Sequence, residues 1–201
     1  MQIIYGSTNQ GKINEVKKLF KNHGIETEVL SLHDIGFTEK IEENGTTFEE
    51  NSMIKARAIK EFCNKNNINK IIITDDAGLL VDALDGRPGV YSARYVSETA
   101  TQVEKLNKLM EELKDVKKED RTASFVCCLT AIMPNGKIIT AKGITEGSIS
   151  ETIGTLGGLT YCPVFIPKGS NRVMNDMTDA EKENTHREKA IKELIPKLGI
   201  K

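Results

Sequence analysis

Residues 70–76 read Lys-Ile-Ile-Ile-Thr-Asp-Asp, an apolar run that leads directly into two adjacent acidic residues. A short apolar run without alternation is typical of a strand that is buried on both faces of a sheet. Such strands belong to α/β proteins, whose ligands bind beyond the carboxyl ends of the strands. The stretch therefore predicts a central strand that ends at Thr74, with Asp75 and Asp76 at a ligand-binding edge.

Strand and helix patterns alternate on either side of this run, and Gly-rich stretches at 36–45 and 78–95 are expected to be loops. Residues 133–137 contain the Pro-Asn-Gly turn of an expected β-hairpin. The predicted strands are residues 2–7, 27–32, 70–74, 122–133, 137–149 and 164–166, and the predicted helices follow residues 7–11, span 47–64 and 103–113, and close the chain. Parallel βα units combined with a hairpin predict an α/β fold with a mixed sheet.

The composition favours one soluble domain over residues 1–201. The chain has 38% hydrophobic residues and a formal net charge of −1, which excludes the strong positive field of a general nucleic-acid binder. No apolar run approaches the roughly 20 residues of a membrane span, and the start lacks a signal-peptide pattern. Four cysteines without a CxxC pair indicate reduced thiols and a cytoplasmic location. The three histidines lack zinc-ligand spacing.

A polar turn, Ser-Thr-Asn-Gln-Gly-Lys at residues 7–12, separates the first predicted strand from its helix. The N-terminus of a helix offers backbone N–H groups and a positive dipole end to an anion, and Lys12 adds an ammonium group. The turn is not a Walker motif. Phosphate binding and an ordinary helix cap both remain open on these residues alone.

Two acidic pairs are candidates for a divalent metal. At the predicted strand end one of Asp75 and Asp76 is expected to face a cleft, while the other hydrogen-bonds loop backbone. Mg²⁺ takes oxygen ligands and usually only one or two carboxylates besides substrate phosphates, so Glu42 or Glu43 could supply the second carboxylate. An Asp turn after a strand and a solvated acidic loop are the alternative interpretations.

Five motifs taken in order resemble the family of non-canonical purine nucleoside triphosphate pyrophosphatases, the inosine and xanthosine triphosphate "house-cleaning" enzymes. The motifs are STNQGKINEV (7–16), EENGTTFEENSMIKARA (42–58), ITDDAGLLVDALDGRPGVYSARY (73–95), GGLTYCPVFIP (157–167) and THREKA (185–190). The resemblance implies an elongated mixed sheet with flanking helices, two lobes around a central cleft, and a homodimer. It also implies Mg²⁺-dependent attack of water on the α-phosphate of a nucleoside triphosphate, with release of pyrophosphate and the monophosphate.

The resemblance assigns roles position by position. Asp76 becomes the catalytic base and a metal ligand, and Glu42 becomes the other metal ligand, with Glu43 as the alternative. The residues expected to bind substrate are Ser7, Thr8, Asn9, Gln10, Gly11, Lys12, Lys55, Ala77, Leu159, Thr160, Tyr161, Cys162, Lys182, His186 and Arg187.

The departures from the family pattern concern the base-binding end. Family members usually read GGFGYDP where residues 157–163 read GGLTYCP, so Leu159 replaces an aromatic residue and Cys162 replaces an aspartate. Ala77 stands in place of a serine, and the spacing from Lys182 to His186 is one residue short. A paralogue with altered base specificity and a nucleotide-binding protein with little turnover are the alternatives to the family's usual activity.

Overall fold

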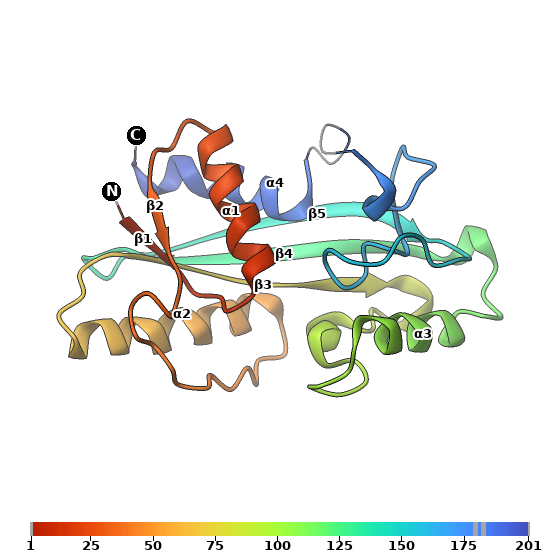
Figure 1. The fold of residues 1–201 in the computed structure, drawn as a ribbon, viewed down its shortest axis with the longest axis horizontal. Helices are drawn as coiled ribbons and strands as arrows, with labels where there is room; N and C mark the ends of the chain where they lie inside the picture. Colours follow the sequence, from red (N-terminus) through yellow and green to blue (C-terminus); the bar gives the residue numbers. More distant parts are fainter. Residues whose placement is uncertain (1, 179–180, 182–183, 201) are drawn as a thin grey trace. The chain divides into compact units, whose positions relative to one another are not determined.

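The computed structural model describes residues 2–178, 181 and 184–200, which form a six-stranded mixed sheet with helices packed against it (Figure 1). The order of the strands in the sheet is β2-β1-β3-β4-β5-β6. β1 pairs in parallel with β2 and β3, whereas β5 and β6 are antiparallel. The predicted α/β class with a mixed sheet is therefore confirmed.

The strands are β1 (Gln2–Tyr5), β2 (Glu28–Leu30), β3 (Ile71–Val81), β4 (Thr122–Ile132), β5 (Ile138–Ile149) and β6 (Phe165–Pro167). The α-helices are α1 (Gln10–Asn22), α2 (Phe48–Lys65), α3 (Gln102–Glu112) and α4 (His186–Leu198). Short 3-10 helices lie at Asp82–Leu84, Gly89–Arg94, Lys118–Asp120 and Met174–Asp176.

Two predicted helix starts are fixed by their caps. Thr47 caps α2, and a reciprocal capping box joins it to Glu50, so the helix begins next to the predicted start at residue 47. Asn9 caps α1 by accepting a hydrogen bond from the backbone N–H of Lys12. Because a side-chain cap stabilises a helix start by about 1 kcal/mol, these local signals define where each helix begins.

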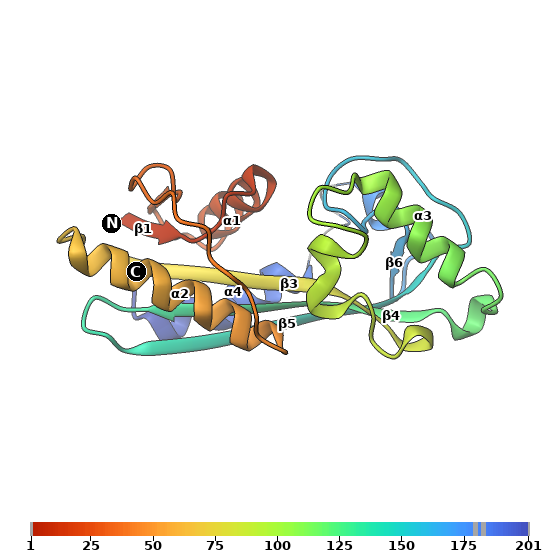
Figure 2. The ribbon, with the colours of Figure 1, turned by 90° about the horizontal axis from the view of Figure 1, so that it is seen from below.

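The chain divides into two compact units. Unit 1 comprises residues 2–76, 127–143 and 187–200, and unit 2 comprises residues 77–126, 144–178, 181 and 184–186. Within unit 1, α2 lies in front of β4 and β5 in Figure 2, and α4 lies behind them. None of the described helices has the length and apolar character that a membrane crossing requires.

A core between the sheet of unit 1 and α2 contains Ile4, Ile72 and Ile59, all fully buried. In parallel register, Ile4 lies opposite Ile72, and both belong to this α2-side core. Residues one position further along each strand face the other side of the sheet, because side chains alternate. This alternation decides where the acidic residues of β3 point.

Candidate functional site

β3 continues through Asp75 and Asp76, so the predicted end of the strand at Thr74 is wrong. Leu79 and Val81 are fully buried and extend the apolar pattern beyond the acidic pair. The two carboxylates therefore lie inside a strand, where consecutive side chains point to opposite faces of the sheet. Each carboxylate has its own set of partners.

Asp75 is the centre of a buried ionic network on one face. Its carboxylate accepts hydrogen bonds from Lys12 Nζ at 2.8 Å and from Arg187 Nη2 at 3.1 Å. Arg187, at the start of α4, also pairs with Glu15 of α1. From the sequence, one carboxylate of the acidic pair is expected to bind a metal and the other to hydrogen-bond loop backbone. The second expectation is wrong for Asp75, because its hydrogen-bond partners are charged side chains of α1 and α4.

The ionic partners dominate the charge state of Asp75. Burial alone would raise the pKa of this carboxyl group, but the positive charges of Lys12 and Arg187 outweigh burial and hold the pKa far below its usual range. Both Asp75 and Arg187 have side chains only 1% exposed, whereas Lys12 is 21% exposed. Lys12 is thus the cation of the network that solvent can reach.

Asp76 faces α2 and belongs to a second cluster. Asn51 Nδ2 donates to its carboxylate at 3.1 Å, and Lys55 Nζ lies 3.6 Å from its other oxygen. The same Lys55 ammonium donates to Glu43 at 2.6 Å. One lysine therefore bridges two carboxylates that are far apart in the sequence.

The conformation of the loop before α2 lets Asn51 bind both Gly45 of the loop and Asp76 of β3. The backbone N–H of Gly45 donates to Asn51 Oδ1 at 2.9 Å. A Cβ at Gly45 would lie 2.7 Å from that same oxygen, so only glycine fits this approach. Asn51 is fully buried and aligned one helical turn before Lys55.

The pKa values of Asp76 and Lys55 are both raised in this cluster. Desolvation raises the pKa of Asp76 above its ordinary value, although Lys55 and Asn51 act against the shift. Burial would lower the pKa of Lys55, but the charges of Asp76, Asp75 and Glu43 raise it. Lys55 thus stays cationic beside a carboxylate whose basicity is increased.

The turn at residues 6–9 joins β1 to α1, as predicted. Ser7 Oγ accepts from the backbone N–H of Asn9 at 3.1 Å, and Asn9 accepts from that of Lys12 at 3.1 Å. Thr8, Gln10 and Gly11 are exposed. The turn therefore presents an exposed helix N-terminus whose lysine reaches Asp75.

Oxygen donors for a metal are present around Asp76. Among residues 2–178, 181 and 184–200, no three His, Cys, Asp or Glu side chains converge as a metal cage. Mg²⁺ does not need one, because one or two carboxylates together with substrate phosphates suffice. Glu43 and Asp76 both pair with the ammonium group of Lys55, whereas the side chain of Glu42 is exposed. The donors fit Mg²⁺, with Glu43 better placed than Glu42.

Most of the residues predicted for the base-binding end belong to unit 2: Leu159, Thr160, Tyr161, Cys162 and His186. Tyr161 and Cys162 are buried in its core, with Cys162 Sγ 3.5 Å from Met174 Sδ, while Leu159 packs against that core. The imidazole of His186 is buried and stacks on Phe125 at a centroid distance of 4.9 Å.

Three further predicted positions have different outcomes. Thr160 is half-buried beside Leu159, and Ala77 is half-buried directly after Asp76 in β3. Lys182 lies outside the described residues. The roles assigned to these positions stay predictions.

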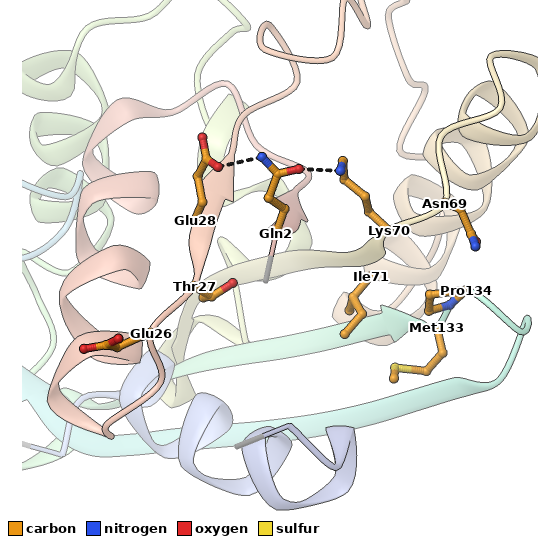
Figure 3. Close-up of a pocket in the computed structure, with 9 residues that line it drawn as sticks. All are labelled: Gln2, Glu26, Thr27, Glu28, Asn69, Lys70, Ile71, Met133 and Pro134. Carbon is orange, nitrogen blue, oxygen red and sulfur yellow. Dashed lines mark hydrogen bonds between the residues drawn. The ribbon is translucent and has the colours of Figure 1, made fainter.

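A separate hollow of about 740 Å³ lies at the amino ends of β1, β2 and β3, away from these clusters (Figure 3). Gln2 spans its mouth by donating to Glu28 at 2.6 Å and accepting from Lys70. Ligands of parallel sheets bind at the opposite, carboxyl ends of the strands. The acidic and basic clusters on β3 are therefore the stronger candidate site.

Comparisons with known proteins agree with the resemblance drawn from the motifs. The profile of the Ham1 family matches residues 3–197. The chain belongs to the Ham1 family.

Curated relatives in the Ham1 family cover nearly the whole chain. A Bacillus subtilis protein named dITP/XTP pyrophosphatase is 42% identical over 194 residues, which are 96% of this chain and 94% of that protein. A Clostridium perfringens protein of the same name is 37% identical, with coverage of 98% and 97%. The solved Staphylococcus aureus Ham1 protein has a TM-score of 0.83 at 33% identity, with coverage of 99% and 98%.

Sequence reasoning missed several residues of this Ham1-family site. Glu15 and Asn51 lie within two of the quoted motifs, but the motifs assign them no role and assign Asp75 no side-chain partner. Helical spacing could have found Asn51, since it lies one turn before Lys55. Nothing in the sequence pairs Arg187 with Asp75, because 112 residues separate them.

The resemblance assigns Arg187 to the residues that bind substrate. In the structure its Nη1 and Nη2 atoms bind Glu15 and Asp75. The observed role is that of a counter-ion within unit 1, and contact with a base stays a prediction.

Proposed function

We propose that the protein is a Mg²⁺-dependent nucleoside triphosphate pyrophosphatase that acts on non-canonical purine nucleotides such as ITP, dITP and XTP. The observation that carries the proposal is the bridge of Lys55 between Asp76 and Glu43 on one face of the sheet, with the pairing of Lys12 and Asp75 on the other face one residue earlier in β3. The names of the curated Ham1-family relatives support this substrate class.

In the proposed reaction, Asp76 accepts a proton from water as the water oxygen bonds to the α-phosphorus. The bond between that phosphorus and the bridging oxygen to the β-phosphate breaks, and pyrophosphate leaves together with a nucleoside monophosphate. A carboxylate whose pKa is raised by burial is a stronger base, which favours this role for Asp76.

The cationic side chains hold the phosphates in this scheme. Lys12 is the solvent-accessible cation of its network, and Asp75 remains neutralised by Arg187 when Lys12 turns to a phosphate. Lys55 keeps its charge because the charges of Asp76, Asp75 and Glu43 raise its pKa. Lys12 and Lys55 both lower the pKa of Asp76, so both cations act at this carboxylate, and in this scheme they contact one polyphosphate.

Asp76 and Glu43, or Glu42, would hold Mg²⁺. When bound, the ion supplies positive charge that neutralises the triphosphate and orients it. The donor set of carboxylates without histidine or cysteine suits a hard cation.

The test is release of pyrophosphate and monophosphate from a panel of inosine, deoxyinosine, xanthosine, adenosine and guanosine triphosphates. We expect a 1:1 product ratio with Mg²⁺, loss of activity with EDTA and recovery when Mg²⁺ is added in excess. The Asp76→Asn variant, purified in parallel, controls for contaminating phosphatases, which would release orthophosphate.

The other outcomes separate the alternatives. Turnover that favours a canonical or differently modified nucleotide indicates a paralogue of altered specificity. Tight nucleotide binding without turnover by the wild-type protein indicates a nucleotide-binding protein, and it contradicts the proposal.

A further inference from the structure

Gln102, in the first turn of α3, binds the backbone of a glycine-containing loop with every polar atom of its side chain. Its Nε2 lies 3.0 Å from the carbonyl oxygen of Gly157, 3.3 Å from that of Leu159 and 3.1 Å from that of Thr160. Its Oε1 accepts from the backbone N–H of Gly157 at 3.0 Å. A primary amide has two N–H donors, so the three carbonyls share them.

The segment held in this way, residues 154–162, is called the glycine loop below. Gly157 has φ of +108° and Gly158 has φ of +62°, both in the region that favours glycine. Two consecutive residues in this region form no regular structure of their own. One backbone hydrogen bond, from Cys162 N–H to the Leu159 carbonyl, lies within the glycine loop, and side chains from outside hold the rest of it.

A second anchor binds the other side of the glycine loop. Asn175 Nδ2 donates to the carbonyl of Thr155 at 2.6 Å, and Asp176 accepts from the backbone N–H of Thr155 at 3.2 Å. Asn175 Oδ1 also lies 2.7 Å from the position of a Cβ at Gly158. This anchor fixes the start of the loop, whereas Gln102 binds the carbonyls of Gly157, Leu159 and Thr160.

Gln102 itself is held on a rigid element. Thr101 caps α3, and a capping box with Glu104 fixes the first helical turn. The side chain of Gln102 links this helical turn directly to the glycine loop. The helix therefore restricts where the loop backbone can lie.

We infer that Gln102 is a positioning residue for the nucleobase: it fixes the backbone of residues 157–160 in the shape that receives the purine ring. The inference rests on the proposed function and on the base-binding role that the family resemblance implies for residues 157–163. Leu159 and Cys162 supply neither an aromatic face nor a carboxylate, and Cys162 is turned into the core. Base recognition in this chain therefore depends more on the backbone of the loop, and hence on Gln102.

The inference is tested by calorimetric binding of two products to the full-length protein. Inosine monophosphate carries the base, and pyrophosphate does not. For Gln102→Ala we expect the Kd of inosine monophosphate to rise about tenfold or more, because an unanchored loop must be ordered on binding. The Kd of pyrophosphate is expected to stay within about twofold, since the loop holds no phosphate.

Two further variants separate positioning from damage to the fold. Gln102→Met keeps the length of the side chain without its hydrogen bonds, and it is expected to behave like Gln102→Ala. Val103→Ala changes the neighbouring, 43% exposed residue of α3 and is expected to leave both Kd values unchanged. Alanine favours helix, so loss of α3 is not the expected cause of any effect.

Each possible result supports or overturns the role inferred for Gln102. Unchanged affinity for inosine monophosphate in both Gln102 variants overturns the inference, as does an equal loss for both products. Wild-type protein that does not bind inosine monophosphate also overturns it. Wild-type protein that binds the monophosphate but hydrolyses no triphosphate refutes the proposed function and still leaves the binding comparison to decide the role of Gln102.

Discussion

Asp75 and Asp76 are consecutive in β3, yet their carboxylates bind to different helices on opposite faces of the sheet. Asp75 pairs with Lys12 of α1 and Arg187 of α4, whereas Asp76 contacts Asn51 and Lys55 of α2. The separation gives the two carboxylates opposite pKa shifts. One carboxylate is suited to hold charges in place and the other to accept a proton.

The Asp76→Asn substitution is expected to reduce kcat by a factor of about 100 or more, because it removes the general base but keeps the shape of the side chain. Burial disfavours the charged form of Asp76, so stability should be unchanged or slightly higher. Steady-state kinetics and thermal unfolding provide the measurements. Retention of more than about a tenth of the wild-type kcat would exclude Asp76 as the base.

Asp75→Asn is expected to act mainly on stability. Removing one partner of a buried ion pair costs about 3–5 kcal/mol, and the lower end applies because Arg187 keeps Glu15. Urea unfolding at pH 7 measures this loss. The exposed Asp115→Asn serves as the matched control and should change stability by less than about 0.5 kcal/mol.

The same carboxylate predicts how stability depends on pH. The pKa of Asp75 is lower in the folded protein than the value of about 3.9 expected in the unfolded chain. Its contribution is therefore present above about pH 4 and is lost as the pH falls below that value. Urea unfolding between pH 7 and pH 3 should show that the free energy of unfolding decreases less with falling pH for Asp75→Asn than for the wild type. The same decrease in both proteins would contradict the pairing.

Lys12→Ala is expected to raise KM for the triphosphate by about tenfold or more while kcat changes less, because this ammonium binds charge that is present before and during the reaction. Lys17→Ala removes a positive charge from the exposed face of the same helix and should leave KM unchanged. Normal KM and kcat in Lys12→Ala would remove the phosphate-binding interpretation of the turn at residues 7–12.

The wild-type protein is expected to prefer inosine over adenosine triphosphate by less than a thousandfold. A pocket without a buried hydrogen-bond partner separates similar ligands by only about 10–200-fold. The double change Leu159→Phe with Cys162→Asp is expected to recover part of the preference. Because Cys162 is 5% exposed, the aspartate lowers stability, so kcat/KM ratios are compared well below the unfolding midpoint.

The Cys127 thiol is expected to be inert in the native protein. Burial raises its pKa to about 12, and Cys63, Cys128 and Cys162 are buried as well. Ellman's reagent should therefore modify no thiol rapidly until denaturant is added. Rapid reaction of one thiol in the native protein would contradict the burial of that cysteine.

Local signals predicted most of the fold. The capping box of Thr47, the spacing of apolar residues in α1 and α3, and the turn at residues 133–137 all depend on neighbours in the sequence. The length of β3 was missed, because Asp75 and Asp76 interrupt its apolar pattern. The low strand propensity of aspartate is outweighed there by the ion pairs that both carboxylates form.

The candidate site was predictable in its residue types but not in its pairings. Asp76, Lys12 and Lys55 were identified from the motifs, and the structure gives each a charged neighbour. The pairs themselves join residues 63 and 112 positions apart, which no local pattern encodes. Gln102 was missed for the same reason, since its partners lie more than 50 residues further along the chain.

The pairing of Asp75 with Arg187 also sets an order of events during biosynthesis. Unit 1 contains residues 2–76 together with residues 187–200, so Asp75 in β3 pairs with Arg187 of α4, which is translated 112 residues later. A nascent chain that lacks α4 would have to bury Asp75 with Lys12 alone. We therefore expect unit 1 to reach its final packing only after the ribosome releases α4, as contacts between distant segments fold late.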